Sequence, residues 1–261
     1  MVHPDEWFAV AQGLIERNIC TVFHEEDLFH LGDQVLLNGM FSVSKQEVVD
    51  GIELCRLIMN LKPLNSNCRP LVGDTPTLPS ATSLGSIFLD QDELLTTSSE
   101  DIKCFFYLFK VPSPWLKNLG FGREVPRELL PADFGPGKGY LVSQVLPMGF
   151  INSVAIAQHI HRNVVRKCLG SLRPPIGGEA EIRRDRVASS SSTLFRIYLD
   201  NFDELQRVSK GMAAALSGAV SPLVSSLREE YTLLGVPRPP KKAVASQLQA
   251  EVQGAYFDGE I

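Results

Sequence analysis

The sequence predicts an α+β fold in which an antiparallel sheet packs on helices. Several stretches repeat apolar residues at helical spacing, and other short stretches have the apolar, β-branched and aromatic composition of strands. With 44% hydrophobic residues in 261, the chain can supply one large core or two small ones. It has no run of eighteen uncharged apolar residues and no basic N-terminal leader. We therefore expect a soluble, intracellular protein of the cytoplasm or nucleus, with no membrane partner.

The first 100 residues predict one helix and one two-stranded ribbon. Residues 5–18 place large apolar side chains at helical spacing behind an acidic start, which indicates an amphipathic helix. Residues 39–45 and 54–61 are short and apolar and are separated by a polar stretch, which is typical of two paired strands. Residues 66–82 are rich in Pro, Ser, Thr and Asn and predict an irregular connector.

The middle of the chain predicts a buried strand, a helix and a loop. The apolar run IKCFFYLFKV at 102–111 follows Asp101 directly and has the composition of a strand covered on both faces. Residues 152–168 repeat apolar residues at helical spacing. Residues 170–193 are rich in Pro, Gly, Ser and charge, and predict a flexible loop.

The last 70 residues predict a strand, two helices and a final hairpin edge. LFRIYL at 194–199 is strand-like, and residues 205–216 place apolar residues at helical spacing. Ser221 followed by proline is a good start for a second helix over about 222–234, because serine caps helices and proline suits the first turn. Residues 252–259 resemble a strand or hairpin edge.

Charge is unevenly distributed along the chain. Residues 1–100 carry 15 acidic and 5 basic residues, whereas residues 101–261 carry 15 acidic and 20 basic residues, and the net charge is −5. Such an asymmetry is compatible with a polyanion partner for the second part, and equally with no partner at all. The five cysteines are far apart and predict reduced thiols. His159 and His161 are two residues apart, so on a helix they point in different directions and favour packing or surface roles.

Four stretches combine into a candidate site. Asp101 precedes the apolar run, LPMGFINSVAIAQ at 146–158 is a turn opening a helix, and YLDN at 198–201 has Asp203 close by. CRLIMNLKPLN at 55–65 adds Arg56 and Lys62 as cations suited to a polyphosphate. Each stretch alone is more typical of an ordinary strand, turn or helix start. Two neighbouring strands that each end in an aspartate would, however, bring together a carboxylate pair suited to magnesium.

Taken in order, these stretches resemble the motifs of reverse transcriptases of retroviruses and retroelements, from about Met40 to Gly259. The matching stretches are RLIMNLKPLN at 56–65, SSEDIKCFFYLFKVP at 98–112, LPMGFINSVAIAQ at 146–158, IYLDN at 197–201, YTLLGVPRPPKKAV at 231–244 and QGAYFDG at 253–259. The resemblance implies a right-hand polymerase fold of fingers and palm. Residues 1–97 would form the N-terminal helix and fingers, and 98–261 the palm, with an insertion at about 170–193 and no thumb or ribonuclease H region.

The resemblance also implies an arrangement inside the palm. Asp101 and Asp200 would lie on neighbouring strands of an antiparallel sheet. The helices of 152–168 and 205–234 would cover one face of that sheet.

The resemblance implies an RNA-directed DNA polymerase, a nucleotidyltransferase that uses two magnesium ions, with manganese as an alternative. Its partners would be an RNA or DNA template with its primer, deoxynucleoside triphosphates and neighbouring parts of a polyprotein. Asp101 and Asp200 would be the catalytic and metal-binding carboxylates, with Asp203 as a further metal ligand and Tyr198 and Asn201 in the active-site hairpin. The implied nucleotide-binding residues are Arg56, Lys45, Lys62, Phe106, Met148, Gly149, Lys241 and Lys242. Phe106 would exclude a 2′-hydroxyl by its bulk.

Two positions depart from the family pattern. Asn201 stands where the family has a second aspartate, and Met148 stands where retroviral members have a glutamine. Loss of one carboxylate removes a negative charge from a site that would hold two dications. The alternative is therefore a catalytically decayed relic that only binds nucleic acid or protein. A third alternative is an unrelated α+β protein in which the motif matches are coincidental.

Overall fold

The computed structural model describes residues 3–260, which divide into two compact units. Unit 1 comprises Met1–Leu71 and Phe106–Ser153, and unit 2 comprises Val72–Phe105 and Val154–Ile261. Each unit combines two separate segments of the chain, so neither coincides with a continuous range such as 1–97 or 98–261. Among the helices of residues 3–260, none is long and apolar enough to cross a membrane.

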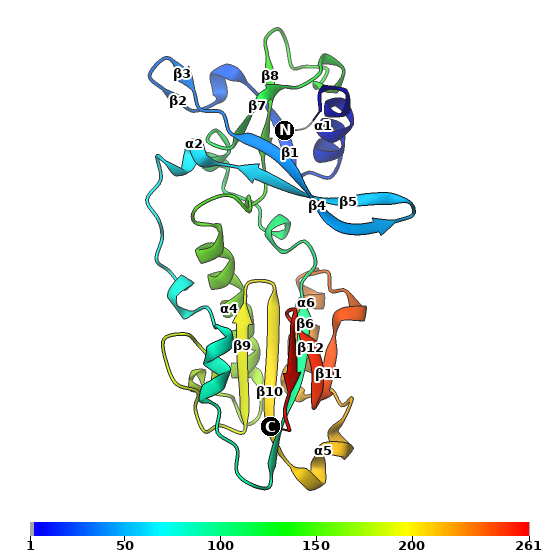
Figure 1. The fold of residues 1–261 in the computed structure, drawn as a ribbon. Helices are drawn as coiled ribbons and strands as arrows, with labels where there is room; N and C mark the ends of the chain where they lie inside the picture. The colour runs from blue at the N-terminus through cyan, green and yellow to red at the C-terminus, as the bar shows by residue number, and fades with distance from the viewer. Residues whose placement is uncertain (1–2, 261) are drawn as a thin grey trace. The chain divides into compact units, whose positions relative to one another are not determined.

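Unit 1 contains a small antiparallel sheet, a long two-stranded ribbon and short helices (Figure 1). Its helices are α1 (Trp7–Glu16), α2 (Lys62–Asn65) and α3 (Ser113–Leu116), with 3-10 turns η1 (Pro4–Glu6), η2 (Glu25–Asp27) and η6 (Arg127–Leu129), and η5 (Phe105–Leu108) at the border with unit 2. Its strands are β1 (Cys20–His24), β2 (His30–Leu31), β3 (Gln34–Val35), β4 (Gly39–Val49), β5 (Ile52–Asn60), β7 (Gly120–Glu124) and β8 (Gly139–Ser143).

The predictions for the N-terminal helix and ribbon are confirmed. Helix α1 buries Trp7, Ala11 and Leu14 in the core of unit 1, as the helical spacing of 5–18 indicates. Strands β4 and β5 pair in antiparallel register around a two-residue turn. Asp50 and Gly51 form that turn with φ of 52° and 77°. Positive φ at both central residues is the requirement of the tight turns that best match strand twist, and Asp-Gly meets it.

Unit 2 is built around a four-stranded antiparallel sheet with strand order β11-β6-β10-β9. The strands are β6 (Glu93–Asp101), β9 (Thr193–Tyr198), β10 (Asn201–Ser209) and β11 (Val244–Gln247), with a separate hairpin of β12 (Gln249–Val252) and β13 (Ala255–Asp258). The helices are α4 (Ser153–Ser171), α5 (Lys210–Leu216) and α6 (Pro222–Leu233), with 3-10 turns η3 (Thr75–Thr77), η4 (Ala81–Ser86), η7 (Gly178–Ala180) and η8 (Pro240–Lys242).

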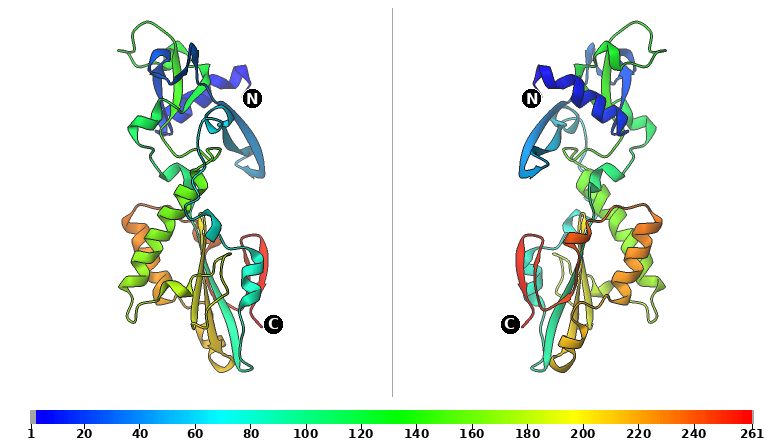
Figure 2. Two further views of the ribbon diagram at one scale, coloured as in Figure 1. Left: turned by 90° about the vertical axis from the view of Figure 1, so that its left-hand side faces the viewer. Right: turned by 90° about the vertical axis from the view of Figure 1, so that its right-hand side faces the viewer.

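The two faces of this sheet are covered differently. Helices α4 and α6 lie on one face, and η4 and the β12–β13 hairpin lie on the other (Figure 2). Alternate residues of β10 serve the two faces. Leu205 joins Leu95, Leu194 and Ile182 in one buried cluster, whereas the buried ring of Phe202 stacks on Phe195, 6.2 Å between ring centres. The expected helix-covered antiparallel sheet is therefore present, with α6 starting at Pro222 and Ser221 accepting a hydrogen bond from Val224 N.

Two predicted elements are wrong. Residues 102–111 are not a strand: the strand is β6, which ends at Asp101. The chain passes from unit 2 to unit 1 between Phe105 and Phe106, so the aromatic residues of this run are divided between the two units. The run turns in η5, directly after Cys104, whose φ is 57°.

The second wrong element is the helix over 205–216, which is helical only from Lys210 onward. The first part belongs to β10, where pairing with β6 and β9 on both sides outweighs the helical spacing.

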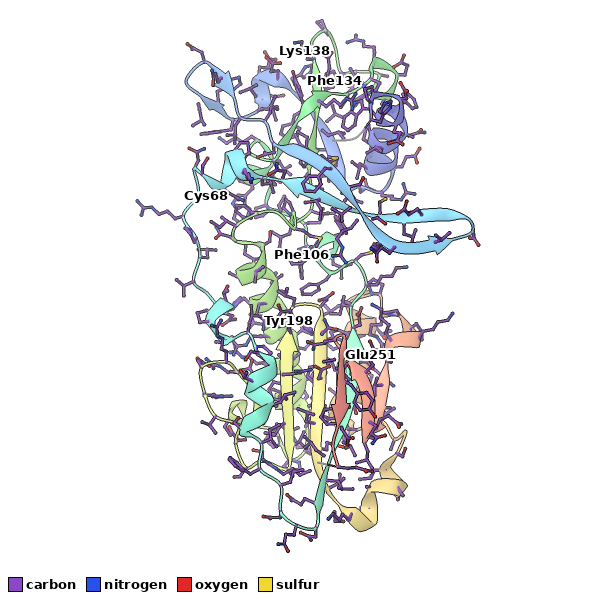
Figure 3. All side chains as sticks on the ribbon, viewed as in Figure 1. Cys68, Phe106, Phe134, Lys138, Tyr198 and Glu251 are labelled. Carbon is purple, nitrogen blue, oxygen red and sulfur yellow. The ribbon has the colours of Figure 1, made fainter. Side chains whose placement is uncertain are left out.

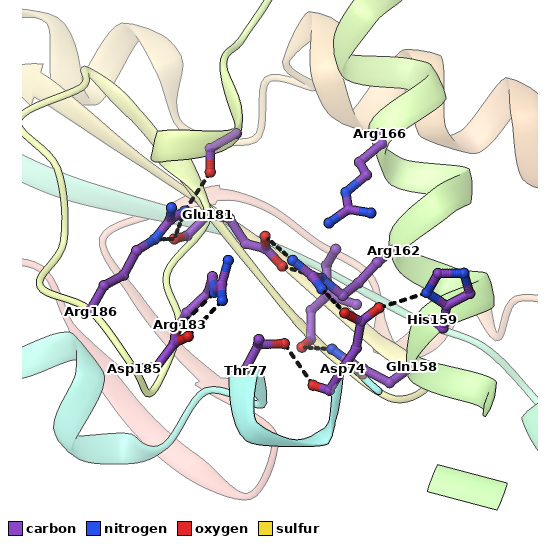
Figure 4. Close-up of polar contacts among 12 residues, drawn as sticks. Asp74, Thr77, Gln158, His159, Arg162, Arg166, Glu181, Arg183, Asp185 and Arg186 are labelled. Atoms are coloured by element: carbon purple, nitrogen blue, oxygen red, sulfur yellow. Dashed lines mark hydrogen bonds and ion pairs between the residues drawn. The ribbon is translucent and has the colours of Figure 1, made fainter. Parts of the chain in front are cut away.

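The segment 170–193 is irregular, as predicted, but it is anchored. Ala180 and Ile182 are buried, and Glu181 forms an isolated bridge with Phe195 of β9. Glu181 also accepts two hydrogen bonds from the buried Arg162 of α4, at 2.7 and 2.6 Å. Arg162 pairs with Asp74 as well, so the loop is tied to both α4 and the connector before η3 (Figure 4).

Candidate active site

The aspartate-bearing ends of two strands lie side by side in unit 2. Asn201, the first residue of β10, is directly opposite Asp101, the last residue of β6, and also opposite Tyr198, the last residue of β9. Leu199 and Asp200 form the two-residue turn between β9 and β10, with Leu199 at φ 52°. The backbone oxygen of Asp200 accepts a hydrogen bond from Ile102 N at 2.9 Å, which joins the turn to the chain leaving β6. Tyr198 marks this end of β9 in Figure 3.

Side chains of α4 fix the backbone of this turn. Gln158 donates to Ile197 O and accepts from Leu199 N, both at 2.8 Å. Nδ1 of His161 contacts the oxygen of Leu199, and Nε2 contacts the Tyr231 hydroxyl. Because a carbonyl oxygen only accepts, Nδ1 carries the proton and Tyr231 donates to Nε2. Burial lowers the pKa of His161 to about 4, so the imidazole is neutral at pH 7.

Polar side chains at this end of the sheet form two separate contacts. Asn201 Nδ2 donates to Asp200 Oδ1 at 3.2 Å. Asp101 Oδ2 pairs with Lys242 Nζ at 3.0 Å, where the aspartate side chain is 19% exposed and the lysine side chain is 65% exposed. Lys241 is its exposed neighbour in η8. Asp101, Asp200, Asn201, Tyr198 and Lys242 thus gather at one end of the sheet.

The segment from Pro237 to Lys242 is held against the end of β6 by three contacts. Lys103 N donates to Pro237 O at 2.9 Å, Arg238 pairs with Glu100 at 3.1 Å, and Lys242 pairs with Asp101. Glu100 is 1% exposed and also pairs with Arg228 of α6 at 2.6 Å. Two arginines therefore neutralise a buried carboxylate next to Asp101 and fix the end of its strand.

Asp203 lies deeper in the sheet and already has partners. Its side chain is 1% exposed, and Oδ1 accepts from Ser99 at 2.7 Å. Oδ2 accepts from Arg196 and from Gln253, both at 2.6 Å. Burial raises its pKa, and the charge of Arg196 and these hydrogen bonds lower it. Its carboxylate joins β10 to β6, β9 and the chain between β12 and β13.

The remaining predicted site residues belong to unit 1. Gly149 lies against β5, where a Cβ would come within 1.9 Å of Met59 O, so the backbone approach requires glycine. Asn65 holds the same loop, because it donates to Gly149 O at 2.8 Å and accepts from Ile151 N at 2.9 Å. Met148 is half-buried in this loop. Asn65, the last residue of the stretch RLIMNLKPLN, thus holds the LPMGF loop in place.

The other unit 1 positions lie on or beside the ribbon. Arg56 is an exposed residue of β5 opposite Val43 of β4. Lys45, in β4, and Lys62, at the start of α2, are also exposed. Phe106 is half-buried in η5, next to Tyr107, whose hydroxyl donates to Leu57 O at 3.3 Å.

Two carboxylates are the candidate metal ligands in unit 2. Within residues 3–260 no group of three or more His, Cys, Asp or Glu side chains is arranged to hold a metal ion. Asp101 and Asp200 are hard oxygen donors at adjoining strand ends, and magnesium characteristically binds through one or two carboxylates together with substrate phosphates. Their carboxylate oxygens are of the type that magnesium prefers.

Comparison with known proteins supports the fold. No family model and no curated protein matches the sequence. Among solved structures, 466 chains match, including the foamy viral protease-reverse transcriptase in complex with double-stranded DNA. That match has a TM-score of 0.55 and 14% identity, and covers 94% of this chain and 32% of that chain. The fold is reverse-transcriptase-like. At this identity the similarity shows the fold alone, and the present chain spans about a third of the neighbour's length.

The sequence analysis missed the residues that support the turn. Gln158 and His161 are three apart on α4, so they share a helix face with the apolar residues that pack on the sheet. Polar residues at that spacing on a buried face signal a specific hydrogen-bond partner. Glu100, Arg228 and Arg238 gave no such signal, because charged residues are usually exposed.

Proposed function

We propose that this chain is the polymerase domain of a reverse transcriptase, with a fingers and palm arrangement, which adds deoxynucleotides to a primer. The observation that carries the proposal is that Asp101 and the Asp200 turn lie at adjoining strand ends in a reverse-transcriptase-like fold. The neighbour's complex with double-stranded DNA supports a nucleic-acid partner. The proposed substrates are a primed RNA or DNA template and deoxynucleoside triphosphates.

In this proposal Asp101 and Asp200 hold magnesium. Bound magnesium would supply positive charge to the reacting phosphate and to the pyrophosphate leaving group. Asn201 contributes through its hydrogen bond to Asp200 Oδ1, which orients that carboxylate while adding no charge. Asp203 is left out of the proposed metal site, since both of its oxygens already accept hydrogen bonds from Ser99, Arg196 and Gln253.

Lys242 has two roles in the proposal. Without metal, it neutralises Asp101 across 3.0 Å and limits the repulsion between the two aspartates. With substrate bound, its long and 65% exposed side chain is free to move to a phosphate oxygen, and Lys241 extends the same positive charge. We assign Arg56, Lys45 and Lys62 to the triphosphate, Met148 and Gly149 to the approach of backbone to nucleotide, and Phe106 to exclusion of a 2′-hydroxyl.

The experiment is primer extension by the full chain on an RNA template with deoxynucleotides and magnesium. Asp101→Ala and Asp200→Ala should each abolish extension. The matched control is Asp92→Ala, because Asp92 is an exposed aspartate just before the opposite end of β6. Circular dichroism should show the same fold in all three variants. Extension by both active-site variants at the parent's rate would refute the polymerase proposal.

A second function is a binding module without polymerase activity, favoured by the neutral Asn201 and by the occupation of Asp101 by Lys242. Asn201→Asp distinguishes the two functions. If the parent does not extend primers but Asn201→Asp does, the site lacks only one carboxylate. A parent that binds nucleic acid identically with and without magnesium, and stays inactive as Asn201→Asp, would favour the binding module.

A further inference from the structure

We propose that unit 2 has a second phosphate-binding site, formed by the arginines of 183–186 and the hydroxyls of η4, which holds the backbone of a nucleic-acid strand. The inference rests on the proposed nucleic-acid function, but it concerns residues outside the Asp101 and Asp200 site. The described residues that line this recess of about 500 Å³ are Ser80, Thr82, Ser83, Ser86, Arg183, Arg184, Arg186 and Val187. None of these lining residues is acidic or aromatic.

The three arginines of this segment differ in how far their positive charge is neutralised. Arg183 is neutralised by Asp185 in a two-point pair, Nε to Oδ1 at 2.9 Å and Nη2 to Oδ2 at 2.6 Å, which lowers the pKa of Asp185. Arg186 donates only to backbone oxygens, those of Gly178 and Glu181. The charge of Arg186 also helps to lower the pKa of Asp185, whereas Arg184 forms no ion pair with a carboxylate within residues 3–260. Both are exposed.

The loop that carries the arginines is held in place by hydrogen bonds and ion pairs within unit 2. Arg186 donates to the backbone of Glu181, whose side chain pairs with Arg162, and the Arg162 side chain is 2% exposed (Figure 4). Ala188 N donates to Ser86 Oγ at 3.0 Å, which fastens the loop to η4. Less side-chain and backbone freedom is lost on binding when the charged loop is already held in place.

The hydroxyls of Ser80, which caps η4, and of η4 itself form a connected group beside these charges. Ser80 Oγ contacts Thr82 Oγ1 at 2.8 Å and Ser83 Oγ at 3.1 Å. Hydroxyls that share hydrogen bonds with each other can turn their protons toward an anion, and Ser, Thr and Arg are the usual partners of backbone phosphates. Because no aromatic side chain lines the recess, stacking on bases is not available, so the ligand should be a phosphodiester bound without sequence preference.

The test is fluorescence anisotropy of a labelled single-stranded oligonucleotide with the full chain at several NaCl concentrations, without magnesium or nucleotides. Arg184→Gln with Arg186→Gln should reduce the slope of log K against log salt by about 1.4, since each phosphate contact contributes about 0.7 for single strands. At 0.1 M salt this corresponds to about 25-fold weaker binding if the affinities converge at 1 M. Arg184→Gln alone, which disturbs no backbone contact of Arg186, should reduce the slope by about 0.7.

The matched control for Arg184→Gln is Arg166→Gln, which removes one positive charge from an exposed part of α4. Equal slopes for these two single variants, or no binding by the parent, would overturn the inference. Competition by inorganic pyrophosphate at constant ionic strength would also overturn it, by identifying a free polyphosphate as the ligand. A parent chain that shows these slopes but does not extend primers would refute the polymerase proposal alone.

Discussion

Glu204 is a buried acid in the middle of β10, and its titration should govern the stability of unit 2. The residue is 1% exposed, and Oε2 has no hydrogen-bond partner among the described residues. Burial raises its pKa from 4.5 to about 7, and a hydrogen bond with Ser221 lowers it. The folded protein therefore binds a proton between pH 4.5 and 7 that the unfolded chain releases. Its contribution to stability is full below pH 4.5 and is lost as pH rises through 7, about 3 kcal/mol in total.

Glu204→Gln keeps the size of this side chain and removes the titration. Relative to the parent, the variant should gain up to about 3 kcal/mol of unfolding free energy between pH 4.5 and pH 8. Urea denaturation at several pH values measures this difference. Because Trp7 and Trp115 both belong to unit 1, the probes should be circular dichroism and hydrogen exchange of β9 and β10 peptides. A difference between variant and parent that does not change with pH would refute the reasoning.

His161 should produce the opposite slope. Its pKa falls from 6.5 in the unfolded chain to about 4 in the folded protein, because burial disfavours the charged imidazole. Its stabilising effect is full above pH 6.5 and is lost as pH falls to 4. Between pH 4.5 and 6.5 the contributions of Glu204 and His161 oppose each other. Glu204→Gln should therefore expose a rise of stability with pH in this window, and a fall in the variant would contradict the assignment.

Three further predictions concern packing, buried charge and thiol reactivity. Gly259→Ala should destabilise unit 2 by about 3 kcal/mol in thermal unfolding, because a Cβ would lie 1.7 Å from Leu95 O. In the control Gly211→Ala, in α5, the Cβ meets no atom within 4 Å, so this variant should be neutral or stabilising. Arg162→Leu should cost about 3–5 kcal/mol, because it leaves the buried Glu181 carboxylate unpaired and removes one partner of Asp74, which keeps its contact with His159. Arg166→Gln on the exposed side of α4 should change urea midpoints little. A thiol reagent at pH 8 should label the exposed Cys55 and Cys104 quickly. Cys20 should react only after unfolding, since burial raises its pKa to about 12. Fast labelling of Cys20 in the folded protein would contradict its burial.

The elements that could be predicted from sequence are those with a local signal. Helix α1 has one apolar face, the β4–β5 ribbon has an Asp-Gly turn, and α6 begins with a serine cap and proline. Strand β6 has no such signal. Its buried residues Thr96 to Glu100 are polar, and they are satisfied by distant partners such as Asp203, Ser246 and Arg228. The apolar composition of the neighbouring run 102–111 therefore led to a strand prediction there, whereas that run connects the two units.

For the candidate site, the sequence indicated which two chain segments to compare, but not the contacts that support them. Family-like motifs located Asp101 and Asp200, and the register of β6 with β10 brings Asp101 opposite Asn201. The state of these side chains depends on contacts between distant residues, such as Lys242 with Asp101 and Gln158 with the backbone of Leu199. Likewise, the loop 170–193 has the composition of a flexible segment, but Arg162, 19 residues before Glu181 in the sequence, holds it in place.

Asn201 is compatible with this fold because the site does not depend on residue 201 for its shape. The turn is held by Gln158 and His161, and the end of β6 is held by Glu100 with its two arginines. The Asn201 side chain donates its hydrogen bond to Asp200 Oδ1, in the same turn. Asparagine and aspartate are nearly equal in size, so Asn201→Asp should preserve the fold while replacing an attraction to Asp200 by a repulsion. That repulsion is relieved by a bound dication, so the substitution should raise magnesium affinity at little cost in packing.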